Sequence, residues 1–217
     1  IAPTSLPVLV TGESGVGKEL LASSIHKASG RRGEYVVINS AGLEDQLFSD
    51  TLFGHVKGAY TGAASDRQGM VAKAAGGTLF LDEIGDLSPE SQVKLLRLVQ
   101  QREYYALGSD KVSRTDTRFV FATNHSLEEL VAKGEFRHDL YYRLRSHTIE
   151  LPPLRERPND LPLLVDYFLD KAAKELGKPR PTPPPELINY LRLYDFPGNV
   201  RELEGLIYDA VVRHTRG

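Results

Sequence analysis

The chain has 217 residues, enough for one large or two small domains with a buried core. Its 27 Lys and Arg residues against 29 Asp and Glu give a formal net charge of −2, which argues against a dedicated nucleic-acid-binding surface. The absence of cysteine excludes disulfides and thiolate metal sites, and no apolar run is long enough to span a bilayer. We therefore expect a cytoplasmic protein with no membrane partner. Because the chain begins at Ile1 without methionine, we also expect it to be a domain excised from a longer protein.

Short apolar runs alternate with helical patterns over the first two thirds of the chain. The apolar runs predict strands at residues 8–11, 35–38, 78–81, 118–122 and 148–151. Helical patterns lie between them at residues 18–28, 89–101 and 127–133. Because most of these strands are apolar without alternation, they are typical of a parallel sheet covered on both faces, and the fold class is α/β.

The pattern changes after Leu151, where Pro152 and Pro153 interrupt the chain. The remainder predicts helices at 160–176, 184–193 and 200–213, with a stiff proline-rich connector at 178–185. Asn199 and Glu202 resemble a capping box that opens the last helix. We predict an α/β domain over residues 1–152 and a small helical domain over residues 153–217.

A glycine-rich segment follows the first predicted strand and opens the first predicted helix. It has the Walker A spacing G-x-x-x-x-G-K in the residues Gly12, Glu13, Ser14, Gly15, Val16, Gly17 and Lys18. Small residues let consecutive backbone N–H groups converge on a phosphate, the helix N-terminus adds partial positive charge, and Lys18 adds a full one. Glu19 stands where a Ser or Thr usually ligates magnesium.

The third predicted strand ends in two carboxylates, Asp82 and Glu83. Such a pair is also common in solvated surface turns. After a buried strand that follows a Walker A segment, however, it is typical of Walker B. Asp82 would then hold Mg²⁺, and Glu83 would polarise the attacking water in ATP hydrolysis.

One further hexamer contains no acid, base or metal ligand. Its residues are Gly58, Ala59, Tyr60, Thr61, Gly62 and Ala63. Taken alone, this composition is typical of a flexible surface turn, because glycine is permissive in φ and ψ.

Together these segments resemble the AAA+ ATPase domain of bacterial sigma-54-dependent activators, the enhancer-binding proteins, over essentially the whole chain. The family's diagnostic hexamer is G-A-F-T-G-A, so Tyr60 replaces its phenylalanine, and the family's Walker A segment has glutamate where Glu19 stands. The resemblance implies a five-stranded AAA+ P-loop fold with a C-terminal helical lid. It also implies that residues 58–63 contact sigma-54, on an inserted loop near 54–65 beside a second one near 103–116.

Other roles follow only from this resemblance. Asn39 matches the asparagine that holds the catalytic glutamate, and Thr123 and Asn124 match the sensor I segment. Arg137 and Arg143 match two candidate arginine fingers that act on the neighbouring subunit's ATP, and Arg201 matches sensor II.

The implied function is an ATP- and Mg²⁺-dependent ring ATPase, hexameric or heptameric. It would convert the closed complex of sigma-54 RNA polymerase holoenzyme to the open complex and activate transcription. Signal input would need an N-terminal region, and enhancer DNA a C-terminal domain, both outside this chain. Two alternatives remain open: an AAA+ ATPase that remodels another protein or DNA, and a nucleotide-dependent DNA-binding regulator that does not activate sigma-54.

Overall fold

The computed structural model describes residues 4–214, which divide into two compact units. The α/β unit contains Lys18–Glu150 together with the segment that ends at Thr11. The helical unit contains the segment that begins at Leu151 and also Gly12–Gly17, which along the chain lie between the first strand and the first helix. No helix within residues 4–214 is both long and apolar enough to cross a membrane.

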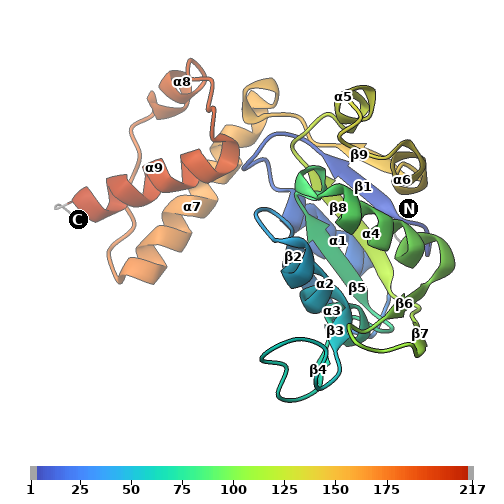
Figure 1. The fold of residues 1–217 in the computed structure, drawn as a ribbon. Helices are drawn as coiled ribbons and strands as arrows, with labels where there is room; N and C mark the ends of the chain where they lie inside the picture. Colours follow the sequence, from blue (N-terminus) through green and yellow to red (C-terminus); the bar gives the residue numbers. More distant parts are fainter. Residues whose placement is uncertain (1–3, 215–217) are drawn as a thin grey trace. The chain divides into compact units, whose positions relative to one another are not determined.

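The α/β unit is built on a parallel sheet of five strands in the order β2-β5-β8-β1-β9 (Figure 1). The strands are β1 (Val8–Thr11), β2 (Tyr35–Asn39), β5 (Thr78–Asp82), β8 (Arg118–Thr123) and β9 (Thr148–Glu150). All six residues of β8 are buried, as are the first four of β5. The predicted parallel α/β sheet is therefore confirmed.

Helices flank this sheet: α1 (Lys18–Ala28), α2 (Asp45–Phe53), α3 (Met70–Lys73), α4 (Pro89–Gln101), α5 (Leu127–Ala132) and α6 (His138–Leu144). A short 3₁₀ turn, Ile84–Asp86, follows β5. Helix α4 shows why a helix begins where it does. The Ser88 side chain accepts a hydrogen bond from the Ser91 N–H, and Pro89 occupies the first turn, where no intrahelical N–H bond is needed.

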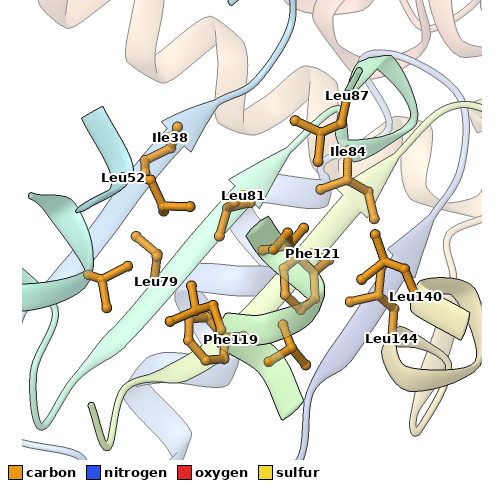
Figure 2. Packing of buried hydrophobic residues seen from close by; sticks show 14 of the residues in the cluster. Ile38, Leu52, Leu79, Leu81, Ile84, Leu87, Phe119, Phe121, Leu140 and Leu144 are labelled. Atoms are coloured by element: carbon orange, nitrogen blue, oxygen red, sulfur yellow. The ribbon is translucent and has the colours of Figure 1, made fainter. Parts of the chain in front are cut away.

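The core of the α/β unit packs one face of the sheet against helices α2 to α6 (Figure 2). Leu81 of β5 and Phe121 of β8 are fully buried, together with Leu52 of α2 and Leu140 and Leu144 of α6. Burying one such side chain contributes about 1.5–3 kcal/mol. This packing holds the carboxyl ends of the strands in a fixed arrangement.

Two short hairpins extend from the α/β unit, in the lower part of Figure 1. Strand β3 (Gly54–His55) pairs antiparallel with β4 (Arg67–Gln68), and we call the residues between them, 56–66, loop 1. Strand β6 (Glu103–Tyr105) pairs antiparallel with β7 (Val112–Arg114), and residues 106–111 are loop 2. Gly54 has φ 77°, and a Cβ there would lie 2.1 Å from the Arg67 carbonyl oxygen, so the base of loop 1 requires glycine.

The helical unit contains α7 (Leu161–Leu176), α8 (Leu187–Leu191) and α9 (Asn199–Arg213). Two 3₁₀ turns, Leu154–Glu156 and Pro158–Asp160, precede α7. Helices α7 and α9 lie side by side in Figure 1. Buried residues of both helices share one core: Leu161, Val165, Phe168, Leu169, Leu203, Ile207 and Val211.

The start of α9 differs from the predicted capping box. The N-cap is Gly198, and its N–H donates to Glu202 Oε2 at 2.8 Å. Glu202 lies four residues after this N-cap rather than three, so the predicted capping box is not formed. The Asn199 side chain makes no cap hydrogen bond, because it is used elsewhere in the helical unit.

Candidate functional site

The carboxyl ends of the parallel strands bring several predicted site residues to one edge of the sheet. Asn39 ends β2 in register with Asp82, which ends β5. Thr123 ends β8 in register with Thr11 of β1. Ligands of open α/β sheets bind at this edge.

Glu83 directly follows β5 in a left-handed conformation, with φ 56° and ψ 47°. A residue other than glycine in this region is strained by about 1 kcal/mol or more, and such strain often marks a functional position. Two hydrogen bonds stabilise this left-handed conformation. Asp82 Oδ1 accepts from the Glu83 N–H at 3.0 Å, and the Asp86 N–H donates to the Glu83 carbonyl at 3.1 Å.

The Glu83 carboxylate lies between a lysine and a backbone donor. Its Oε1 is 3.8 Å from Nζ of Lys18. Lys18 is the first residue of α1 and is only 6% exposed. The Glu83 Oε2 accepts from the Asn124 N–H at 3.2 Å. The structure thus brings Lys18, Asp82, Glu83 and Asn124 together within the α/β unit.

The Asn39 side chain forms its hydrogen bond with its own turn rather than with Glu83. Its side-chain oxygen accepts from the Ala41 N–H at 2.9 Å, and within residues 4–214 no hydrogen bond joins it to Glu83. Thr123 is fully buried, and its hydroxyl accepts from the His125 N–H at 3.0 Å. The predicted sensor I segment reaches Glu83 through the Asn124 backbone N–H rather than through a side chain.

The glycine-rich segment 12–17 has the backbone expected of a phosphate cradle. Gly12, Gly15 and Gly17 have φ values of 147°, 78° and 109°, which other residues rarely adopt. In the described part of the chain, the N–H groups of residues 14–17 donate no hydrogen bond to the protein. These unused donors fit phosphate oxygens. Glu19 lies exposed in the first turn of α1.

Within the helical unit, this segment is held by two residues that sequence reasoning did not assign to the site. Asn199 is fully buried and left-handed, with φ 53°, and its Nδ2 donates to Glu13 Oε2 and to the Ser14 carbonyl, both at 3.0 Å. Arg155 donates to both carboxylate oxygens of Glu13, at 2.9 and 2.6 Å. The bonds from Arg155 and Asn199 lower the pKa of Glu13 to about 2.

The predicted sensor II residue lies beside the same segment. Nη1 of Arg201, in the first turn of α9, is 3.4 Å from the Ser14 hydroxyl oxygen, at the long limit of a hydrogen bond. For the nearby Asn199, the one signal in the sequence is its residue type, because asparagine adopts the left-handed region more readily than most residues.

The two candidate arginine fingers differ in their partners. Arg137, at the N-cap of α6, donates through Nε and Nη2 to the Asp139 carboxylate at 3.0 and 2.7 Å. Arg143, in the last turn of α6, is exposed, and within residues 4–214 its guanidinium forms no hydrogen bond or ion pair. Arg143 is therefore the more available donor.

Residues 58–63 form the tip of loop 1 as a compact turn. The Gly58 N–H donates to the Ala63 carbonyl at 2.9 Å, and the Ala63 N–H donates to the Tyr60 carbonyl at 3.0 Å. Thr61 and Gly62 are exposed, whereas the Tyr60 ring packs edge-on against the His55 ring with 5.1 Å between centroids.

Loop 2 is hydrogen-bonded to the base of loop 1. The Leu107 N–H donates to the Gly54 carbonyl at 2.9 Å, and the Val56 N–H donates to the Leu107 carbonyl at 3.1 Å. The two loops thus form one connected structure.

The order of the strands, the glycine-rich segment after β1, the acidic pair at the end of β5 and the helical lid define an AAA+ P-loop NTPase fold. The chain matches the Sigma-54 interaction domain family over residues 1–150 and the AAA+ ATPase lid domain over residues 155–217. It belongs to the sigma-54 interaction domain family, as the resemblance of its motifs implies.

Its relatives are transcriptional regulators. The chain is 48% identical over 218 residues to a formate hydrogenlyase transcriptional activator of Salmonella typhimurium, covering 100% of this chain and 31% of that protein. It is 49% identical over 220 residues to a Nif-specific regulatory protein of Azorhizobium caulinodans, covering 98% and 36%. The chain therefore spans about a third of the length of these curated relatives.

A solved structure shares the whole fold. The crystal structure of NtrX from Brucella abortus in complex with ADP has a TM-score of 0.91 at 33% identity, covering 100% of this chain and 47% of that one. The complex of the same protein with ATP has a TM-score of 0.89 at 32% identity, covering 97% and 48%.

Proposed function

We propose that this chain is the motor domain of a sigma-54-dependent transcriptional activator. It binds and hydrolyses ATP in a ring of subunits and drives sigma-54 RNA polymerase from the closed to the open complex, in the cytoplasm. The observation that carries the proposal is that one α/β unit holds both the Lys18, Glu83 and Asn124 arrangement and the exposed tip of loop 1. The nucleotide complexes of NtrX support ATP as the ligand.

In this proposal the residues of the glycine-rich segment bind phosphate through their unused N–H groups, and Lys18 neutralises charge on the terminal phosphates. Asp82 is the residue that would hold Mg²⁺, which spreads the negative charge of the phosphates when bound. Glu83 orients the attacking water and accepts its proton. Because the Asn124 N–H binds the Glu83 carboxylate, a shift of the sensor segment would re-aim this base.

A ring would place ATP between neighbouring subunits, so that an arginine from one subunit acts on the nucleotide of the next. Arg143 is our choice for this finger, because Arg137 is already bound to Asp139. A finger acting in trans contributes on the order of a thousandfold or more to turnover. Mixing Arg143→Ala subunits with Glu83→Ala subunits tests this role, because some sites in a mixed ring regain both groups. Mixed rings with no more ATPase activity than either variant alone would contradict it.

The partner of loop 1 is tested by Thr61→Ala. Thr61 lies exposed at the tip and outside the nucleotide residues, so ATP hydrolysis should stay near normal while sigma-54 binding and open-complex formation are lost. The matched control is Thr182→Ala, at an exposed threonine between α7 and α8, which should change neither activity. If Thr61→Ala activates transcription normally, the ATPase would have to act on another protein or on DNA. Signal input and enhancer binding are left to segments outside these residues.

A further inference from the structure

A buried carboxylate lies at the base of loop 1, outside the nucleotide residues. Asp50 is in the last turn of α2 and is only 4% exposed. This position is unfavourable for an anion for two reasons. Burial removes the charge from water, and the C-terminus of a helix carries partial negative charge. No basic residue lies in the last turn of α2 to offset this charge.

Two donors from outside the helix converge on this carboxylate. His55 Nδ1 lies 2.5 Å from Asp50 Oδ1, and Arg67 Nη1 donates to Oδ2. A carboxylate can only accept, so the His55 hydrogen is on Nδ1. His55 is itself buried, at 8% exposure, whereas the Arg67 side chain is 45% exposed.

The two donors lie at the two ends of loop 1. His55 is the last residue of β3, Arg67 is the first residue of β4, and the two are paired in the hairpin register. A hairpin of two residues per strand is too short to fix an eleven-residue loop by its backbone bonds alone. The Asp50 carboxylate adds a charge-assisted hydrogen bond at each end.

We propose that Asp50 is a positioning residue that clamps both ends of loop 1 and thereby sets the pose of its tip. Its effect reaches the tip through His55, because the Tyr60 ring packs edge-on against the His55 ring. It also reaches loop 2, because Leu107 bonds to the residues on either side of His55. One buried carboxylate thus orders the segment that meets the partner and the loop beside it.

The clamp can be tested without any partner protein. Because the chain contains no cysteine, a single introduced cysteine can be spin-labelled specifically. A spin label on Ser65→Cys, at an exposed position of loop 1, reports the mobility of the loop by electron paramagnetic resonance. Asp50→Asn removes the charge while keeping the shape, so the mobile component of the spectrum should rise. Arg67→Gln breaks only the β4 end and should raise it less. If Asp50→Asn does not fold, Arg67→Gln decides the question by itself.

The matched control is Asp45→Asn, in the first turn of the same helix. Asp45 accepts hydrogen bonds from Ser88 and Ser91, far from the loop in sequence, so this variant should weaken α2 without mobilising the label. An unchanged spectrum in folded Asp50→Asn, or an equal rise in Asp45→Asn, would overturn the clamp.

The consequence for the partner rests on the proposed function and is measured separately. Sigma-54 binding by Asp50→Asn should weaken about tenfold, because the competent pose of the tip is less populated, whereas ATP turnover should not change. A mobilised label with unchanged sigma-54 binding would leave the clamp standing and contradict the role proposed for loop 1. A merely structural role for Asp50 predicts loss of ATP turnover in parallel with binding.

Discussion

Asn199 is the residue whose replacement should affect the helical unit most clearly. Its side chain makes three hydrogen bonds while fully buried: Oδ1 accepts from the Leu154 N–H at 2.8 Å, and Nδ2 donates to Glu13 and to the Ser14 carbonyl. Its φ of 53° adds backbone strain that asparagine tolerates and alanine does not. The variant Asn199→Ala removes the bonds and keeps the strain.

The size of the effect follows from these contacts. Leaving the buried Leu154 N–H without an acceptor costs about 1–3 kcal/mol, and losing the two donated bonds costs about 1 kcal/mol more. The left-handed backbone adds about 1 kcal/mol for alanine. We expect Asn199→Ala to destabilise the helical unit by about 4 kcal/mol. Asn199→Gly loses the same bonds without the backbone strain, so it should be less destabilising by about 1 kcal/mol.

Native-state hydrogen exchange measures this effect where it arises. Amides of α9 should lose protection in Asn199→Ala, while amides of β8, which belongs to the α/β unit, serve as the internal control and should not change. A loss of α9 protection smaller than about 0.5 kcal/mol, the range of ordinary surface substitutions, would contradict the role of the Asn199 side chain. Equal destabilisation by Asn199→Gly and Asn199→Ala would contradict the contribution of backbone strain.

Three further outcomes are expected. Lys18→Ala should abolish nucleotide binding measured by calorimetry, and retained tight ATP binding would contradict the assignment of the phosphate loop. Because bonds from Arg155 and Asn199 lower the pKa of Glu13 from 4.5 to about 2, this carboxylate stabilises the fold above about pH 4.5, and that stabilisation is lost as the pH falls toward 2. In Glu13→Gln, stability should therefore depend less on pH in that window, as measured by acid unfolding monitored with circular dichroism. An unchanged acid-unfolding profile would argue against the ion pair. Tyr60→Phe should change stability by less than about 0.5 kcal/mol. The His55 Nδ1–H already points to Asp50, so the Tyr60 hydroxyl 3.4 Å away adds little and the ring contact remains; a large loss in thermal unfolding would show that the hydroxyl matters.

Elements with strong local signals were predictable from the sequence. The bounds of β1, α1 and α4 match the predictions to the residue, because an apolar run, a phosphate-loop signature and a Ser-Pro helix start mark them. Shorter elements were missed or predicted with wrong bounds. Strands β3 and β4 have two residues each, too few for any periodicity. Helix α8 is shorter than predicted, at Leu187–Leu191 instead of 184–193, because consecutive prolines precede it.

The residues of the candidate site also divide into those with a local sequence signal and those without one. Residues that belong to a local motif could be predicted: Lys18 from the Walker A spacing, and Glu83 from its place at the end of an apolar strand that follows the Walker A segment. The support of the phosphate loop could not, because its contacts join distant parts of the chain: Arg155 and Glu13 are 142 positions apart, and Asn199 and Glu13 are 186 apart. Nothing in the local sequence around Asn199 distinguishes a helix cap from a side chain that holds a loop.

Backbone strain is a second reason why parts of the candidate site could not be predicted from the sequence. In the described part of the chain, four residues other than glycine have positive φ, and two of them, Glu83 and Asn199, carry polar side chains of the candidate site. In both, the unusual backbone decides where the side chain points: Glu83 toward Lys18, and Asn199 toward Glu13. Such a conformation persists only where surrounding contacts over-determine it. At Glu83 those contacts include the Asp82 carboxylate and the 3₁₀ turn that follows. Replacing Glu83 with glutamine should keep this backbone and remove only the proposed base, whereas replacing Asp82 should disturb both. The two variants should therefore be separable in function, although the two acidic residues are adjacent in sequence.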